Sequence, residues 1–153
     1  MMNAKFESSI DDIGMKIIRE LQVNARSTYS EIGKRVGLSS PAVAERIYKM
    51  EASRIINGYH ANINPNIFGH NIMAFITLTT HPEEYKKIYS FAENHKEIIE
   101  CHHVSGNASF IIKVVSGSIS HLESMVEKLS KFGETKSSIV LSSPIQKSMM
   151  ESI

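Results

Sequence analysis

The chain of 153 residues contains a single cysteine, Cys101, so no disulfide can form within it. Such scarcity is typical of proteins from a reducing compartment. The sequence also lacks any apolar run near the ~20 residues that a membrane-spanning helix requires. Its N-terminal stretch lacks the apolar core of a signal peptide and carries Asp11 and Asp12. We therefore expect a cytoplasmic protein with no membrane partner.

A global excess of positive charge is missing too, because the net charge is only +1. Residues 1–63 carry nine Lys/Arg and seven Asp/Glu (+2), and residues 64–153 carry eight and nine (−1). A nucleic-acid-binding protein with so little net charge must concentrate its cations locally or act as an oligomer. The hydrophobic content of 42% is ordinary for a globular protein, and the length allows one domain or two small ones.

Patterns typical of catalysis are also missing. The sequence has no Ser-His-Asp spacing, no glycine-rich phosphate loop and no paired carboxylates, so we expect no enzymatic activity and no cofactor. Cys101, His102 and His103 suggest a metal cluster. Alternate residues of a strand face opposite sides, however, so only Cys101 and His103 would share a face. Two ligands are fewer than zinc requires, and we expect no metal site.

The strongest local pattern lies in residues 28–50, which predict two helices joined by a tight turn. Thr28 and Glu31 have the spacing of a capping box at the start of the first helix. Gly37 suits the end of that helix because glycine tolerates a positive φ. Ser40 is expected to cap the second helix, with Pro41 in its first position. An earlier amphipathic helix with Ile13, Ile17 and Leu21 completes a predicted three-helix domain over residues 1–54.

The second helix of this pair has two different faces. Val43, Ile47 and Met50 share the face that is expected to point into the core. The opposite face begins with small residues and ends in cations, which suits a helix that approaches DNA bases closely. Helical hairpins without DNA binding look similar, so this pattern alone leaves both interpretations open. The residues predicted to contact DNA are Tyr29, Lys34, Ser39, Ser40, Pro41, Ala42, Glu45, Arg46 and Lys49.

Residues 54–63 are rich in β-forming residues and contain the hairpin dipeptide Asn57-Gly58. They predict either a wing or a single strand with a bulge at Gly58. Residues 62–65 are turn-like and form a natural hinge. Residues 66–153 then alternate: strand 72–79, a helix from Pro82, strands 98–104 and 110–115, a second helix with a stripe from Ile119 to Leu129 that Gly133 ends, and strand 137–141. This βαββαβ order predicts an α+β, ferredoxin-like domain with both helices on one sheet face.

The other sheet face is expected to be unusually apolar. Met73 and Phe75 on the first strand, and Ile111 and Val115 on the third, alternate with residues that face the helices. An uncovered apolar face of this kind implies a partner. We expect a second copy of the chain, and hence a homodimer formed through the C-terminal domain.

The spaced residues along the whole chain resemble the Lrp/AsnC, or feast/famine, family of transcriptional regulators. The resemblance is carried by Asp11-Asp-Ile-Gly-Met-Lys-Ile-Ile, Arg26, Glu31-Ile-Gly-Lys-Arg-Val-Gly-Leu-Ser39, Glu45-Arg46, Met50-Glu51, Ile56-x-Gly-Tyr59-x-Ala61, Asn64-Pro65 and Gly106-Asn107. It implies a helix-turn-helix domain that binds double-stranded DNA, a linker strand with its hinge over residues 55–65 in place of the wing, and an ACT-like effector and oligomerisation domain. It also implies dimers that assemble into octamers and an amino-acid-like effector.

Two departures from the family pattern have consequences. Arg54 stands where the family usually has glycine, so it must adopt a positive φ at about 1 kcal/mol or end its helix differently. The effector loop of amino-acid-sensing members resembles Gly-Asp-x-Asp, whereas this chain has Gly106-Asn107-Ala108-Ser109. Without those carboxylates an effector's ammonium lacks an anion, so we expect a weak response to leucine or asparagine unless Glu134 or backbone carbonyls substitute. The predicted effector residues are Ser105, Gly106, Asn107, Ala108 and Ser109.

Two alternative functions are compatible with the same architecture. Some proteins built like this family resemble haem-precursor decarboxylases that hold a tetrapyrrole with histidine and arginine. The intact helix-turn-helix with Arg46 and Lys49 argues against that alternative. The other is an effector-binding module whose DNA-binding domain is vestigial.

Overall fold

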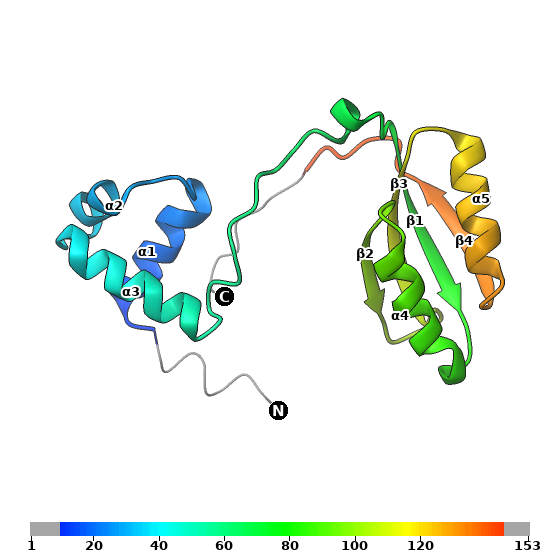
Figure 1. The fold of residues 1–153 in the computed structure, drawn as a ribbon, viewed down its shortest axis with the longest axis horizontal. Helices are drawn as coiled ribbons and strands as arrows, with labels where there is room; N and C mark the ends of the chain where they lie inside the picture. Colours follow the sequence, from blue (N-terminus) through cyan, green and yellow to red (C-terminus); the bar gives the residue numbers. More distant parts are fainter. Residues whose placement is uncertain (1–9, 146–153) are drawn as a thin grey trace. The chain divides into compact units, whose positions relative to one another are not determined.

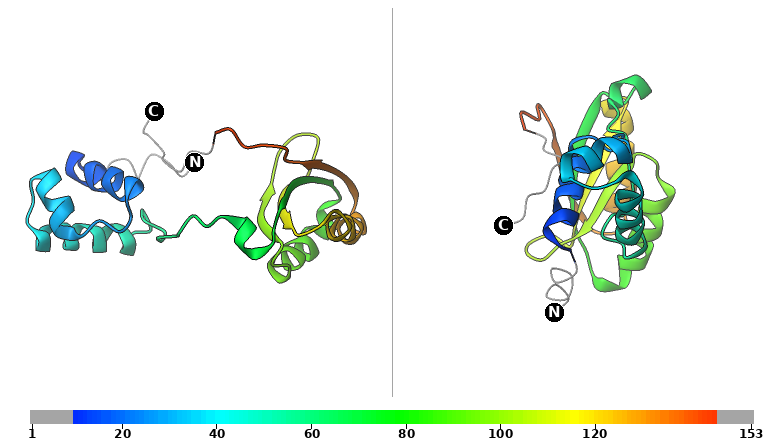
Figure 2. Two further views of the ribbon diagram at one scale, coloured as in Figure 1. Left: turned by 90° about the horizontal axis from the view of Figure 1, so that it is seen from above. Right: turned by 90° about the vertical axis from the view of Figure 1, so that its left-hand side faces the viewer.

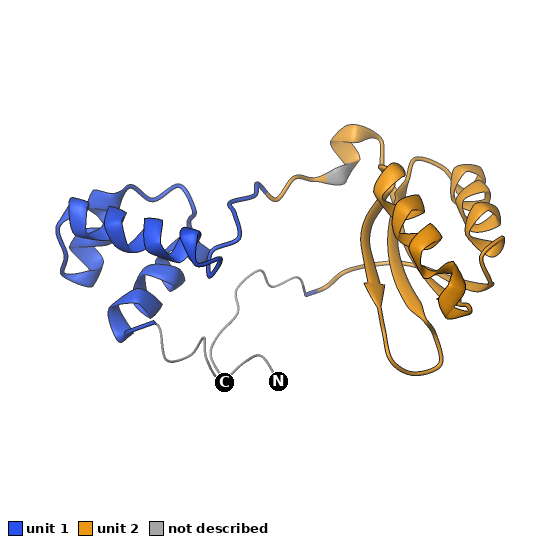
Figure 3. Cartoon of the chain, turned by 60° about the horizontal axis from the view of Figure 1, so that its bottom comes forward, with its two compact units in different colours: residues 1–61, 145–153 blue, residues 62–144 orange. Residues whose placement is uncertain are grey.

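The computed structural model describes residues 10–145 of the chain (Figure 1). The ends of the predicted domains, residues 1–9 and 146–153, lie outside this range. The described chain divides into two compact units after Ala61 (Figure 3). We call the described residues up to Ala61 the head, and Asn62–Pro144 the sheet unit.

The head consists of α1 (Asp12–Val23), α2 (Tyr29–Val36) and α3 (Ser40–Ala52). Each helix contributes one apolar stripe to a common core, as the spacing of three and four residues predicts. The fully or nearly buried core residues are Ile17, Ile32, Val43, Ile47 and Met50. The helix-turn-helix architecture predicted from the sequence is confirmed.

The chain leaves α3 through Arg54, whose φ of 57° is the left-handed conformation that its place in the sequence requires. This conformation costs an arginine about 1 kcal/mol. The following residues supply the compensation. The N–H groups of Ile55 and Ile56 both donate to the carbonyl oxygen of Met50, at 2.9 and 3.1 Å. Both isoleucine side chains pack against the head core, and partial burial of this kind contributes about 1–2 kcal/mol.

Residues 55–63 do not form the linker strand expected from the sequence. A strand is held by ladder hydrogen bonds to a neighbouring strand, and none of the described strands pairs with this segment. Its β-forming composition is therefore not sufficient to make a strand within one chain. A short 3-10 helix, η2 (Pro65–Phe68), follows the segment.

The sheet unit has the predicted βαββαβ order. Its elements are β1 (Ile72–Thr79), the short η3 (Pro82–Glu84), α4 (Tyr85–Asn94), β2 (Ile98–His103), β3 (Phe110–Ser116), α5 (Ile119–Ser130) and β4 (Glu134–Ile139). The strands are antiparallel in the order β2-β3-β1-β4. The last strand begins at Glu134 rather than at residue 137, because Glu134 already pairs with Thr79 on β1.

Helices α4 and α5 lie on the same side of this sheet (Figure 2). The core forms between them and the strands, where alternate residues of β1 and β3 point inward. The buried residues of this core are Ala74, Ile76, Leu78, Ile88, Phe110, Ile112, Val114, Leu122, Met125 and Leu129. The predicted placement of both helices on one face is confirmed, and within residues 10–145 no helix or strand covers the opposite face of the sheet.

Candidate nucleic-acid interface and effector site

The start of α2 is fixed by the capping box that its sequence predicts. The backbone N–H of Thr28 donates to Glu31 Oε2 at 2.7 Å, and the N–H of Glu31 donates back to Thr28 Oγ1 at 3.2 Å. These hydrogen bonds from Thr28, with its hydroxyl as a further donor, hold the pKa of Glu31 below its usual value. The capping box therefore satisfies the N–H groups of Thr28 and Glu31 at the start of α2, the helix that leads into the turn before α3.

The turn itself requires two glycines for different reasons. Gly37 has a φ of 75°, and its N–H donates to the carbonyl oxygen of Gly33. At Gly33 the requirement is space, because an added Cβ would lie only 2.4 Å from the carbonyl oxygen of Leu38. The sequence predicted the role of Gly37, but it gave no signal for the close approach at Gly33.

The exposed face of α3 and its N-cap carry most of the residues predicted to contact DNA. Ser39, rather than Ser40, caps the helix, since its side chain accepts from the N–H of Ala42 at 3.4 Å. Pro41 accordingly occupies the second helical position. Ser39, Ser40 and Pro41 are all exposed, so the N-terminal end of α3 is open to a partner.

Two cations of this face are held by neighbouring acids in the free protein. Arg46 donates to Asp11 Oδ1 at 2.8 Å, and Lys49 donates to Glu45 Oε1 at 2.6 Å. Asp11 also caps α1 by accepting from the N–H of Gly14. The hydrogen bond from Arg46, followed by that from Gly14, holds the pKa of Asp11 below its usual value. The Asp11–Arg46 pair thus joins the start of α1 to the middle of α3 at the protein surface.

Other residues of the predicted DNA set are more widely distributed. Lys34 is exposed near the end of α2. Tyr29, at the start of α2, lines a cavity bounded by α1 and α3. Tyr48 on α3 was not predicted, although its side chain is 71% exposed. The helical period that puts Val43, Ile47 and Met50 on the core face puts Tyr48 away from it, so the spacing could have identified this residue.

The predicted effector loop, residues 105–109, connects β2 to β3 and is fastened to the end of β1. The Ser109 hydroxyl donates to the carbonyl oxygen of Thr80 at 3.0 Å and accepts from the N–H of Thr80 at 3.1 Å. Thr79 Oγ1 donates to the carbonyl oxygen of Asn107 at 3.1 Å. The hydroxyl of Ser109 is therefore engaged within the fold, whereas Ser105, Gly106 and Asn107 are exposed.

The turn before β4 meets the same end of the sheet. Gly133 approaches β1 so closely that an added Cβ would lie 2.2 Å from the carbonyl oxygen of Thr79. Next to it, Glu134 is the direct cross-strand partner of Thr79. Thr79 and Glu134 therefore share one face of the sheet, and Thr79 contacts the loop at Asn107. This register brings a carboxylate to the neighbourhood of the predicted effector residues.

The uncovered sheet face combines apolar and charged side chains. Met73 lies opposite Val115, and Thr77 lies opposite Ile111. Between these pairs, Phe75 remains 38% exposed. At the β2 edge, Glu100 accepts from Lys113 at 2.8 Å and lies 3.2 Å from His102 Nε2. These partners hold the pKa of Glu100 below its usual value, the hydrogen bond from Lys113 being the larger cause.

The Cys-His-His run is separated by the sheet, as the alternation of a strand predicts. Cys101 pairs with the inward-facing Ile112, and His103 packs against the ring of Phe110 at 5.1 Å between centroids. His102 lies on the opposite face beside Glu100. Within residues 10–145 no group of three or more His, Cys, Asp or Glu side chains is arranged to hold a metal ion. In the same range no helix is long and apolar enough to cross a membrane.

Comparisons with known proteins match both units. Residues 10–51 match the AsnC-type helix-turn-helix domain, and residues 73–150 match the Lrp/AsnC ligand binding domain. The HTH-type transcriptional regulator YezC of Bacillus subtilis is 38% identical over 134 residues, which cover 88% of this chain and 95% of that protein. The regulator LrpA of Mycobacterium tuberculosis is 32% identical over 136 residues, with 87% and 91% covered. A structure of a feast or famine regulatory protein from M. tuberculosis complexed with L-methionine has a TM-score of 0.83 at 29% identity, covering 92% of this chain and 97% of that one.

Proposed function

The chain belongs to the Lrp/AsnC family of transcriptional regulators, and from this premise we propose how its two units divide the work. The head binds double-stranded DNA through the turn between α2 and α3 and through the exposed face of α3. The sheet unit pairs with a second copy and senses a small, amino-acid-like effector. Such a regulator acts where the chromosome is, so a cytoplasmic location without enzymatic activity is part of the proposal.

The main observation behind the DNA-binding proposal is that the N-terminal end of α3 is exposed and lies on the same helix as Arg46 and Lys49. Both cations are paired with acids only at the protein surface. The side chains of Arg46 and Asp11 are 36% and 53% exposed, and those of Lys49 and Glu45 are 71% and 67% exposed. Exposed pairs contribute only about 0–1 kcal/mol, so phosphates or base edges can replace the acids at little expense. A footprint on the DNA that flanks the chain's own gene tests the proposal. We expect half-sites separated by multiples of about 10 bp, and absence of protection would refute it.

The uncovered sheet face supports self-association. Met73, Phe75 and Ile111 form its apolar part, and a second copy related by a two-fold axis would present the same residues. We propose a homodimer formed through this face, and further assembly of dimers into an octamer. Light scattering measures the mass directly, and a monomer at micromolar concentration would refute the dimer.

The end of the sheet near Thr79 is the proposed effector site. Exposed Gly106 and Asn107 offer backbone groups and an amide, and Glu134 supplies a carboxylate on the neighbouring strand. The solved relative complexed with L-methionine supports an amino acid as the class of ligand. Calorimetry with the twenty amino acids tests this site. Asn107→Asp adds a carboxylate without disturbing Ser109 and is expected to raise the affinity for amino acids, whereas an unchanged affinity would remove Asn107 from the site.

A further inference from the structure

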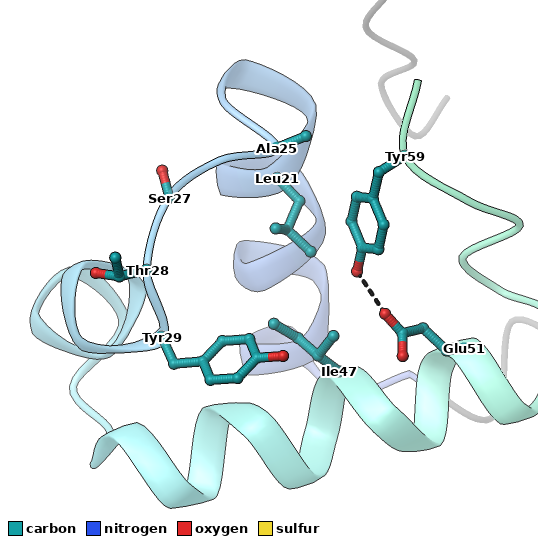
Figure 4. Close-up of a pocket in the computed structure, with 8 residues that line it drawn as sticks. All are labelled: Leu21, Ala25, Ser27, Thr28, Tyr29, Ile47, Glu51 and Tyr59. Atoms are coloured by element: carbon teal, nitrogen blue, oxygen red, sulfur yellow. Dashed lines mark hydrogen bonds between the residues drawn. The ribbon is translucent and has the colours of Figure 1, made fainter. Parts of the chain in front are cut away.

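A cavity of about 420 Å³ opens in the head and is used neither by the exposed face of α3 nor by the effector loop (Figure 4). It lies between α1, the connection from α1 to α2, α3 and the segment that follows α3. Pockets for small ligands commonly enclose 300–1,000 Å³, so the volume suits a small organic molecule.

The lining of the cavity separates into an apolar part and a polar rim. Leu21, Ala25 and Ile47 provide aliphatic surface. The polar residues of the lining are Ser27, Thr28, Tyr29, Tyr59 and Glu51, and Glu51 supplies the one carboxylate. The hydroxyls of Ser27 and Thr28 point away from the cavity (Figure 4). No lysine, arginine or histidine is among these lining residues, so the only ionic group of the cavity is an anion.

That anion is paired with a tyrosine. The hydroxyl of Tyr59 donates to Glu51 Oε1 at 2.8 Å, as Figure 4 shows. Partial burial, together with Glu51, raises the pKa of Tyr59 to about 12, so the hydroxyl stays protonated and keeps donating. Among the described residues, the structure records no hydrogen bond to the second oxygen of Glu51. The carboxylate thus retains the capacity to accept from a ligand.

On the side of the cavity lined by Thr28, this residue has no free donor to offer a ligand carboxylate. The first N–H groups of a helix ordinarily attract carboxylates. At α2, however, Glu31 Oε2 already accepts from the N–H of Thr28 at 2.7 Å and from its hydroxyl at 2.9 Å. The hydrogen-bonding groups of Thr28 are therefore taken up by Glu31, and the only ionic side chain that a ligand carboxylate would meet among the lining residues is the like-charged Glu51.

We propose that this cavity binds a small organic ammonium ion with an apolar body, that is, a primary alkylamine rather than an amino acid. The ammonium group donates to Glu51 and lies near the rings of Tyr29 and Tyr59, which favour a cation at their faces. The alkyl body packs against Leu21 and Ile47. The inference does not depend on the effector proposal, and of the residues predicted to contact DNA only Tyr29 lines the cavity.

Three probes with the same branched body test the proposal by calorimetry on the full chain. The first probe, 3-methylbutylamine, has the amine alone. Leucine has both the amine and a carboxylate, and 4-methylpentanoate has the carboxylate without the amine. We expect the amine to bind with a Kd of about 1 mM or tighter and 4-methylpentanoate not to bind. No heat with the amine at about ten times that concentration, or equal binding of 4-methylpentanoate, would overturn the proposal.

Variants locate the site. Glu51→Gln is expected to weaken amine binding at least about tenfold, because it removes a charge-assisted hydrogen bond. Ala25→Leu fills the cavity without changing charge and is expected to abolish binding, which keeps the test valid if Glu51→Gln folds poorly. Asp12→Asn removes an exposed acid of α1 outside the cavity and serves as the matched control. Unchanged amine binding in both cavity variants, or leucine binding that is lost in Ala25→Leu, would refute the assignment.

Discussion

Replacing Arg46 with alanine tests the DNA interface most directly, because the structure predicts a small effect on folding and a larger one on DNA. In the free protein Arg46 pairs with Asp11 at 2.8 Å, and both side chains remain substantially exposed. An exposed pair contributes about 0–1 kcal/mol to the free energy of unfolding. The Arg46→Ala head should therefore stay folded, with its core of Ile17, Ile32, Val43, Ile47 and Met50 intact.

The loss of Arg46 is expected to cost more binding free energy in the DNA complex than folding free energy in the free protein. A bidentate contact between an arginine and a guanine contributes about 1–3 kcal/mol, and releasing Arg46 from Asp11 offsets up to about 1 kcal/mol of it. With middle values of about 2 and about 0.5 kcal/mol for the two terms, the net loss for Arg46→Ala is about 1.5 kcal/mol, or roughly tenfold in affinity for the specific site. Asp11→Asn makes the opposite prediction. Asparagine still caps α1, but it competes less for the guanidinium, so binding should tighten by up to about fivefold.

Fluorescence anisotropy measures these affinities with a duplex from the chain's own upstream region and a scrambled duplex of equal length. Circular dichroism melts of both variants verify the fold. Arg46→Ala should lose affinity for the specific duplex more than for the scrambled one, since a base contact carries sequence information and a phosphate contact does not. If folded Arg46→Ala protein binds the specific duplex as tightly as the wild type, the assigned recognition face is wrong.

Three further tests address other parts of the structure. Lys34→Ala or Lys49→Ala should weaken binding to every duplex, and each should reduce the slope of log K against log salt by about 0.9. An unchanged slope would show that the lysine in question does not contact a phosphate. Phe75→Lys puts a charge on the uncovered sheet face and should dissociate the dimer, as measured by light scattering. Ile119→Lys puts the same charge on α5 and should leave the dimer intact. Equal masses for both variants would contradict pairing through the sheet face. Gly33→Ala should lower the free energy of unfolding by about 1–3 kcal/mol, because its Cβ meets a backbone oxygen at 2.4 Å; a melting temperature like that of the wild type would show that the turn adjusts freely.

Several features of this protein are determined by local sequence. The capping box of Thr28 and Glu31 and the left-handed Gly37 depend on hydrogen bonds and backbone preferences within one helical turn. The apolar stripes of α1 to α3 and the alternation in β1 and β3 depend on the periods of helix and strand. Even the positive φ of Arg54 could be anticipated, because the family pattern puts glycine there. Local rules suffice for the caps and for the periodic stripes, since no distant residue takes part in them.

Tertiary structure alone decided the contacts between distant residues. Arg46 donates a hydrogen bond to Asp11, which lies 35 positions earlier in the chain. Ser109 donates a hydrogen bond to Thr80, which lies 29 positions earlier. The linker's β-forming residues make no strand because none of the described strands pairs with them, and Glu134 comes beside Thr79 only through the register of β4. Each outcome depends on which surfaces meet after the helices and strands pack. A sequence pattern specifies what a segment can do, and the packed neighbour determines whether its polar groups are already satisfied.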